Sequence, residues 1–117
     1  MRVLIVDSDK AFCQILAEVL EKKGHDVAWT AHGLQAYKMS LRVRYELAVL
    51  DVRMSPLPGT ELAEALKHLN PGMKIILTSA FVDEALKNKA QIIGFPLLSK
   101  PFTTEKLLEF ASEAAQA

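Results

Sequence analysis

The chain has 117 residues, half of them apolar and about a quarter charged, which is the composition of an ordinary globular domain. Its 14 basic and 14 acidic residues give a formal net charge of zero, which argues against a basic nucleic-acid-binding surface spread over the whole domain. The single cysteine excludes an internal disulfide, and no apolar run approaches the roughly 20 residues that cross a bilayer. We therefore expect one cytoplasmic domain over residues 1–117 that contacts neither nucleic acid nor membrane.

The first half of the chain alternates apolar runs with helical patterns. A strand is expected at 3–6, an alternating edge strand at 26–31 and a continuous apolar strand at 47–50. The helix after the first strand ends before Gly24, a residue suited to a C-terminal cap. A less regular helix follows over 34–41, with a solvated end at 41–46. The inward stripe of the first helix is expected to contain Phe12, Ile15, Leu16, Val19 and Leu20.

The second half continues the same alternation. Strands are expected at 74–79 and 95–99, and helices over 62–69, from about 83 to 93, and from Thr103 or Thr104 onward. Most of the strands are continuous apolar runs, which is typical of parallel strands covered on both faces. Five repeats of strand and helix predict a doubly wound α/β sheet.

Polar residues lie at or just after the ends of four of these strands: Asp7, Ser8 and Asp9, then Asp51, Thr78 and Lys100. In open parallel sheets, ligands bind beyond the carboxyl ends of the strands, so these side chains are expected to converge. Clustered carboxylates raise one another's pKa unless a cation is present, and Mg²⁺ prefers such hard oxygen ligands. A carboxylate in this setting can attack phosphorus, while a hydroxyl and an ammonium bind the phosphoryl oxygens.

The ordered motifs VLIVDSD, LAVLDVRM, IILTSA and SKPF, with Gly59 after the second, resemble the receiver domain of two-component response regulators. The resemblance covers essentially the whole chain. It implies a flavodoxin-like (βα)5 fold, with a parallel five-stranded sheet and helices on both faces. It also implies a phosphorelay signalling switch, with slow self-phosphorylation and autodephosphorylation, rather than an enzyme that turns over a metabolite.

The resemblance assigns roles to individual residues. Asp51 is expected to accept a phosphoryl group from a sensor histidine kinase or phosphotransfer protein. Asp7, Asp51 and the backbone carbonyl of Arg53 are expected to hold Mg²⁺, and Thr78 and Lys100 to bind the phosphoryl group. The peptide bond after Lys100 is expected to be cis. The fourth helix, fifth strand and fifth helix are expected to form the face for a homodimer or output partner.

The sequence also departs from the family pattern. Ser8 stands where the family has a second acid that binds Mg²⁺, which predicts weaker metal binding and slow or donor-restricted phosphorylation of Asp51. Asp9 is either a compensating acid or a helix N-cap. Leu97 stands where the family often has Tyr or Phe, so any switch must depend on Thr78 and backbone shifts.

Two alternatives remain open. A degenerate receiver that binds partners without phosphorylation is favoured by Ser8 and Leu97, and opposed by the retained acceptor and lysine. The DSD stretch also resembles the first motif of haloacid-dehalogenase-like phosphatases, with Asp7 as nucleophile and Asp9 as general acid/base. That second alternative leaves Asp51 without a role.

Overall fold

The structure is a computed structural model that describes residues 1–116 of the chain, and their side chains as far as residue 112. Strands and helices alternate along these residues without exception. Their bounds are β1 (Arg2–Val6), α1 (Lys10–Lys22), β2 (Asp26–Thr30), α2 (Gly33–Arg42), β3 (Leu47–Asp51), α3 (Gly59–Leu69), β4 (Lys74–Ser79), α4 (Glu84–Ile93), β5 (Leu97–Ser99) and α5 (Thr104–Gln116).

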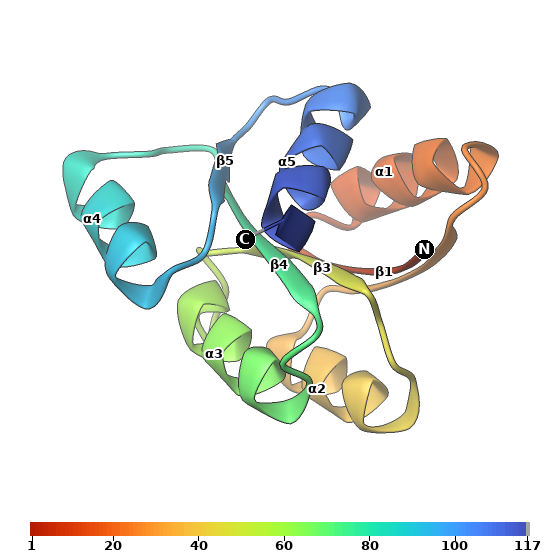
Figure 1. Cartoon of the computed structure of the whole chain (residues 1–117), viewed down its shortest axis with the longest axis horizontal. Helices are drawn as coiled ribbons and strands as arrows, with labels where there is room; N and C mark the ends of the chain where they lie inside the picture. Colours follow the sequence, from red (N-terminus) through yellow and green to blue (C-terminus); the bar gives the residue numbers. More distant parts are fainter. Residues whose placement is uncertain (117) are drawn as a thin grey trace.

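The strands form one parallel five-stranded sheet in the order β2-β1-β3-β4-β5. Helices α1 and α5 cover one face, while α2 and α3 cover the other, with α4 beside the β5 edge (Figure 1). The strand order reverses between β1 and β3, and such a reversal opens a crevice at the carboxyl ends of the two strands. The predicted doubly wound fold is confirmed, and Asp7 and Asp51 lie at this reversal.

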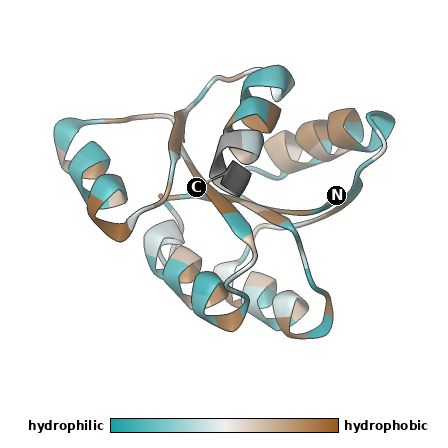
Figure 2. Cartoon of the chain, in the orientation of Figure 1, coloured by the Kyte–Doolittle hydropathy of each residue, from teal (hydrophilic) through white to brown (hydrophobic). Residues whose placement is uncertain are grey.

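Alternate residues of the central strands supply two separate hydrophobic cores. Leu4 and Leu50 belong to the core under α2 and α3, whereas Ile5 and Val49 belong to the core under α1 and α5. Figure 2 accordingly shows the strands coloured as hydrophobic and much of the helix surface as hydrophilic. Burial on both faces explains why the apolar runs are continuous. The polar residues lie where these buried runs end.

Caps at the helix ends follow the sequence signals. The Asp9 carboxylate accepts the backbone N–H of Phe12 at 3.0 Å and caps α1. Thr103, one of the two candidates, caps α5 by accepting the N–H of Lys106 at 3.1 Å. Gly24 has a φ of 93°, which only glycine adopts readily, and it ends α1 as predicted.

Two expectations about packing were wrong. Ile15 was expected on the inner face of α1, but it is 64% exposed, and the residues of α1 that are fully covered are Cys13, Leu16, Ala17 and Leu20. The apolar stripe of α1 is therefore wider than the part that the sheet covers. Tyr45 does not belong to a solvated helix end, because α2 stops at Arg42 and the Tyr45 ring is buried in the core under α2 and α3.

The structure also settles two smaller points. Strand β5 is shorter than the 95–99 run, with only three residues. Among the helices of the described residues, none is long and apolar enough to cross a membrane.

Candidate functional site

The structure brings Asp7, Asp51 and Lys100 together at the carboxyl edge of the sheet. The Lys100 ammonium forms an ion pair with Asp7 Oδ2 and lies 3.9 Å from Asp51 Oδ2. The Lys100 side chain is 18% exposed, so its charge is largely removed from water. Two carboxylates thus share one ammonium in a small and mostly desolvated space, which strengthens each electrostatic interaction.

Both oxygens of the buried Asp7 carboxylate are occupied. Oδ1 accepts the backbone N–H of Asp9 at 2.9 Å, and Oδ2 accepts from Lys100. Behind Asp7, the Cys13 thiol donates to the Asp7 carbonyl at 3.3 Å, and burial raises the pKa of Cys13 to about 11. Asp7 is therefore held from two sides, and Cys13 is a buried neutral thiol that packs behind it.

Asp51 presents one occupied and one available oxygen. Its Oδ1 accepts the backbone N–H of Arg53 at 3.1 Å, while Oδ2 faces Lys100 beyond hydrogen-bond distance. Burial raises the pKa of Asp51, and the Arg53 N–H and Lys100 oppose this rise. Asp51 is thus a buried carboxylate with one oxygen directed toward a cation, which is the geometry of a nucleophile or a metal ligand.

Thr78 lies beside Asp51 in the sheet, because the two residues are register partners of β4 and β3. Its hydroxyl donates to the Leu50 carbonyl over a long 3.4 Å. A hydrogen bond of this length is weak, so the hydroxyl can turn toward a new acceptor at small cost.

Ser8 and Asp9 do not join Asp7 as a second acidic group. Both side chains are exposed, and the Asp9 carboxylate is engaged as the N-cap of α1. Among the residues whose side chains are described, no three His, Cys, Asp or Glu side chains gather as a metal-binding group. Asp7 and Asp51 supply carboxylate oxygens, which are the ligands that Mg²⁺ prefers. Among the same described side chains, a third carboxylate, which would add negative charge at the site, does not lie beside them.

The side chain of Arg53, which the motifs left unassigned, bridges the loops after β3 and β4. Its guanidinium donates to the Phe81 carbonyl at 3.1 Å and lies 5.6 Å from the centre of the Phe81 ring. Ser79 supports the same loop, because its hydroxyl donates to the Phe81 carbonyl at 2.8 Å and accepts the Phe81 N–H at 3.1 Å. Leu97, at the usual aromatic position, is half-buried.

Phe12 is the residue near the site that sequence reasoning placed only as packing. Its ring centre lies 4.4 Å from the Lys100 ammonium. The two residues are far apart in the chain, and no local pattern links them. The peptide bond between Lys100 and Pro101 is cis, as the resemblance implied.

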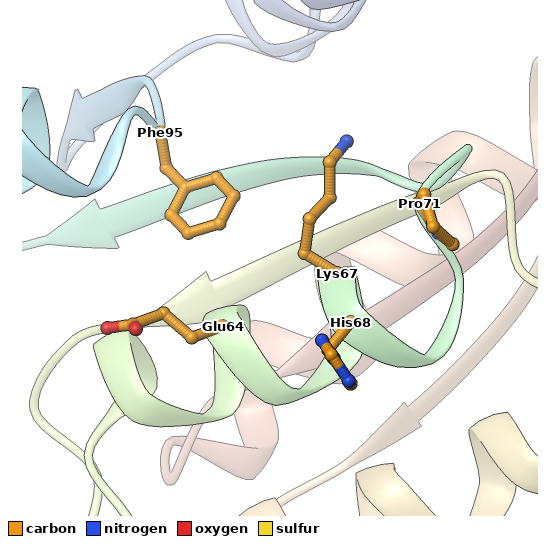
Figure 3. Close-up of a pocket in the computed structure, with 5 residues that line it drawn as sticks. All are labelled: Glu64, Lys67, His68, Pro71 and Phe95. Carbon is orange, nitrogen blue, oxygen red and sulfur yellow. The ribbon is translucent and has the colours of Figure 1, made fainter.

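A hollow elsewhere on the surface is not part of this site. It measures about 470 Å³ and is lined by Glu64, Lys67, His68, Pro71 and Phe95 (Figure 3). The Lys67 ammonium donates to the Met73 carbonyl at 2.7 Å and so is engaged at the opposite end of β4 from Thr78. None of the residues expected to handle a phosphoryl group lines this hollow.

The chain is similar to curated proteins of bacterial signalling. It is 30% identical over 109 residues to a response regulator receiver protein of Anaeromyxobacter sp. strain Fw109-5, covering 92% of this chain and 46% of that protein. It is 34% identical over 117 residues to the transcriptional regulatory protein ZraR of Klebsiella oxytoca, covering 96% of this chain and 26% of that protein. The chain therefore spans less than half the length of these two relatives.

Solved structures show the same architecture. A response regulator receiver domain protein from Methanospirillum hungatei has a TM-score of 0.89 at 28% identity, covering 98% of this chain and 93% of that one. A response regulator from Burkholderia pseudomallei, with a phosphorylated aspartic acid and a calcium ion, has a TM-score of 0.88 at 25% identity, covering 98% and 71%. The family model for the response regulator receiver domain matches residues 3–112, and this chain belongs to that family.

Proposed function

We propose that Asp51 accepts a phosphoryl group and that its modification switches a partner-binding face of a single receiver domain over residues 1–117. Receiver domains are phospho-accepting switches that interact with histidine kinases or phosphotransfer proteins and bind Mg²⁺ at their acidic pocket. The observation that carries the proposal is the position of Lys100 Nζ, 3.9 Å from the available oxygen of Asp51. The Burkholderia pseudomallei neighbour, which carries a phosphorylated aspartic acid, supports it.

In the proposed reaction, Asp51 Oδ2 attacks the phosphorus of a phosphohistidine or a small acyl phosphate. A new bond forms between Oδ2 and phosphorus, and the bond from phosphorus to the donor nitrogen or oxygen breaks, so the electron pair leaves with the donor. The Lys100 ammonium stabilises the negative charge on the phosphoryl oxygens, and the Thr78 hydroxyl turns from the Leu50 carbonyl toward them.

Asp7, Asp51 and the carbonyl of Arg53 would hold Mg²⁺, which neutralises phosphoryl charge and aligns donor and acceptor when bound. The neutral Ser8 hydroxyl contributes less to such a site than a carboxylate. Lys100 is paired with Asp7, so it must share that carboxylate with the metal or move toward Asp51.

The proposed output is a shift in a pre-existing equilibrium of the face formed by α4, β5 and α5. Within this face, helix α4 carries the apolar Ile92 side chain at 83% exposure. The longer relatives, of which the chain spans a part, are consistent with an attached or separate output partner.

A phosphorylation-independent interaction module is the second candidate. The specific observation in its favour is that Ser8 and Asp9 bring no further carboxylate into the site. The haloacid-dehalogenase alternative needs Asp9 as a general acid/base, whereas the Asp9 carboxylate caps α1, and this alternative leaves Asp51 without a role.

Intact mass spectrometry separates the two candidates. The protein is incubated with acetyl phosphate and Mg²⁺, beside an Asp51→Asn variant as the matched control. The proposed function predicts a gain of one phosphoryl group in the wild type and none in the variant. An unchanged wild-type mass, under conditions that modify another receiver domain, would favour the interaction module, and the same mass measurement with a phosphohistidine donor would then decide between the two.

A further inference from the structure

The surroundings of the Lys100 ammonium contain a partner that the proposed chemistry does not use. The ammonium meets Asp7 Oδ2 in an ion pair, Asp51 Oδ2 at 3.9 Å, and the ring of Phe12 at 4.4 Å from its centre. A cation within about 6 Å of a ring centre is attracted by the negative face of the ring, and more strongly when it is desolvated. At 18% exposure, the Lys100 side chain meets this condition.

The backbone of Phe12 is linked to the residues that build the site. Asp9 donates its N–H to Asp7 Oδ1 at 2.9 Å, and its carboxylate accepts the N–H of Phe12 at 3.0 Å. The Phe12 ring then meets Lys100, which is paired with Asp7 Oδ2. These four residues form a closed circuit, in which Asp9 holds the backbone of Phe12 and the Phe12 ring lies over the ammonium.

The Phe12 ring also packs against a second aromatic ring. Phe102 meets Phe12 edge to face, with ring centres 5.9 Å apart and planes at 82°. Phe102 lies just after Lys100 and Pro101, so the loop after β5 supplies both the ammonium and a ring that packs against Phe12.

From this arrangement we propose that Phe12 is a positioning residue that holds the Lys100 ammonium at the mouth of the site. The ring attracts the ammonium without a formal charge. A carboxylate in the same place would add a third anion, beside Asp7 and Asp51, that competes with an incoming phosphoryl group. The effect of Phe12 on phosphoryl transfer rests on the proposed function. The contact between Phe12 and Lys100 does not depend on that function.

The competing explanation is that Phe12 only packs against Phe102 and α1. Phe102→Leu is the matched control, because it removes a ring from the same cluster without removing the ring over Lys100. Phe12→Leu removes that ring, and Phe12→Tyr restores an aromatic face. Thermal unfolding of all three variants shows that each one is folded before it is compared.

Nuclear magnetic resonance tests the contact without any phosphoryl donor. Protons above a ring face resonate upfield, so the Lys100 Hε signals of the wild type are expected upfield of those of other lysines. They are identified by their loss in Lys100→Met. We expect the upfield shift to vanish in Phe12→Leu and to persist in Phe12→Tyr and Phe102→Leu. A wild-type Lys100 signal that lies with the other lysines would overturn the proposal.

The rate of phosphorylation by acetyl phosphate, followed by intact mass, tests the consequence. We expect Phe12→Leu to slow the reaction about three- to tenfold, as befits the loss of one cation–π contact, and Phe12→Tyr to stay within about twofold of the wild type. Equal slowing by Phe12→Leu and Phe102→Leu would show a packing role and refute the inference. A wild type that takes no phosphoryl group from acetyl phosphate counts against the proposed function, and the Lys100 signal then decides the contact alone.

Discussion

Gly59 lies directly against the backbone of Asp51. A side-chain carbon built on Gly59 would lie 2.0 Å from the Asp51 carbonyl oxygen and 2.8 Å from the Cα of Val52. The Gly59 N–H donates to the Val52 carbonyl at 3.2 Å, so the first residue of α3 closes the loop after β3. Glycine is thus required here by close approach of backbone to backbone, at the residue proposed to accept the phosphoryl group.

The first prediction follows from that contact. Gly59→Ala must displace either α3 or the backbone of Asp51, and overpacking of this kind costs about 1–3 kcal/mol or more. Urea unfolding is expected to show that loss of stability. Gly72→Ala is the control, because a side-chain carbon built on Gly72 would lie 3.5 Å from Asn70 Oδ1, which is an ordinary contact distance. Equal stability of the two variants would contradict the close approach.

The second prediction concerns the ion pair between Lys100 and Asp7. Lys100→Met keeps the length of the side chain but leaves the buried Asp7 carboxylate without its cation. We expect a loss of roughly 2–4 kcal/mol in the free energy of unfolding, somewhat less than for a fully buried pair because Lys100 keeps some exposure.

An exposed ion pair provides the comparison for this prediction. Lys23 and Glu105 lie 3.5 Å apart with side chains 40% and 75% exposed. Lys23→Met should change the stability by less than about 1 kcal/mol, as is usual for surface pairs. If Lys100→Met is as mild as Lys23→Met, then Lys100 is not needed to compensate Asp7.

The third prediction is a pH dependence set by Asp51. Burial raises the pKa of Asp51 in the folded chain, so the folded state holds the proton more tightly than the unfolded chain does. The ionised Asp51 carboxylate therefore lowers the free energy of unfolding by its full amount above the raised pKa. This loss disappears below the pKa of about 3.9 that an aspartate has in the unfolded chain. Asp51→Asn should be more stable than the wild type at pH 7, and this gain should shrink as the pH falls through that window.

Urea unfolding at several pH values between 4 and 7 measures this difference. Asp83→Asn is the control, because Asp83 is exposed, caps α4 through the N–H of Leu86 at 2.8 Å, and asparagine caps equally well. A stability gain of Asp51→Asn that is constant over this range would show that desolvation of the charge is not its source.

The fourth prediction concerns the serine at the metal-binding position. Ser8→Asp adds a carboxylate next to Asp7, and an added charge near a cation contributes about 1–4 kcal/mol at 4 Å, depending on solvent exposure. Calorimetric titration is expected to show Mg²⁺ binding at least about fivefold tighter than in the wild type. Ser8→Asn, with the same shape and no charge, should bind Mg²⁺ like the wild type.

Asp9 is tested in the same titration. Because its carboxylate caps α1, Asp9→Asn should preserve both stability and Mg²⁺ affinity, whereas Asp9→Ala should cost about 1 kcal/mol of stability. Weaker Mg²⁺ binding by Asp9→Asn would instead identify Asp9 as an acid that compensates for Ser8.

The sequence by itself determined the order of the elements and the strand ends at which the polar residues occur. Continuous apolar runs identify buried parallel strands, and Asp7, Asp51, Thr78 and Lys100 each lie at or just beyond the carboxyl end of one of them. Parallel strands share an edge, so the direction of the strands alone brings these residues to one side of the sheet. The caps at Gly24 and Thr103 were also predictable, because they depend only on neighbouring residues.

Only the tertiary structure decided which of several possible contacts each residue makes. It placed Asp9 on the end of α1, turned Ile15 outward, buried Tyr45, and set Phe12 over Lys100. The physical reason is that helical periodicity identifies an apolar stripe but not how much of it the sheet covers. A contact between an ammonium and a ring from opposite ends of the chain depends on packing, which leaves no mark on the local pattern.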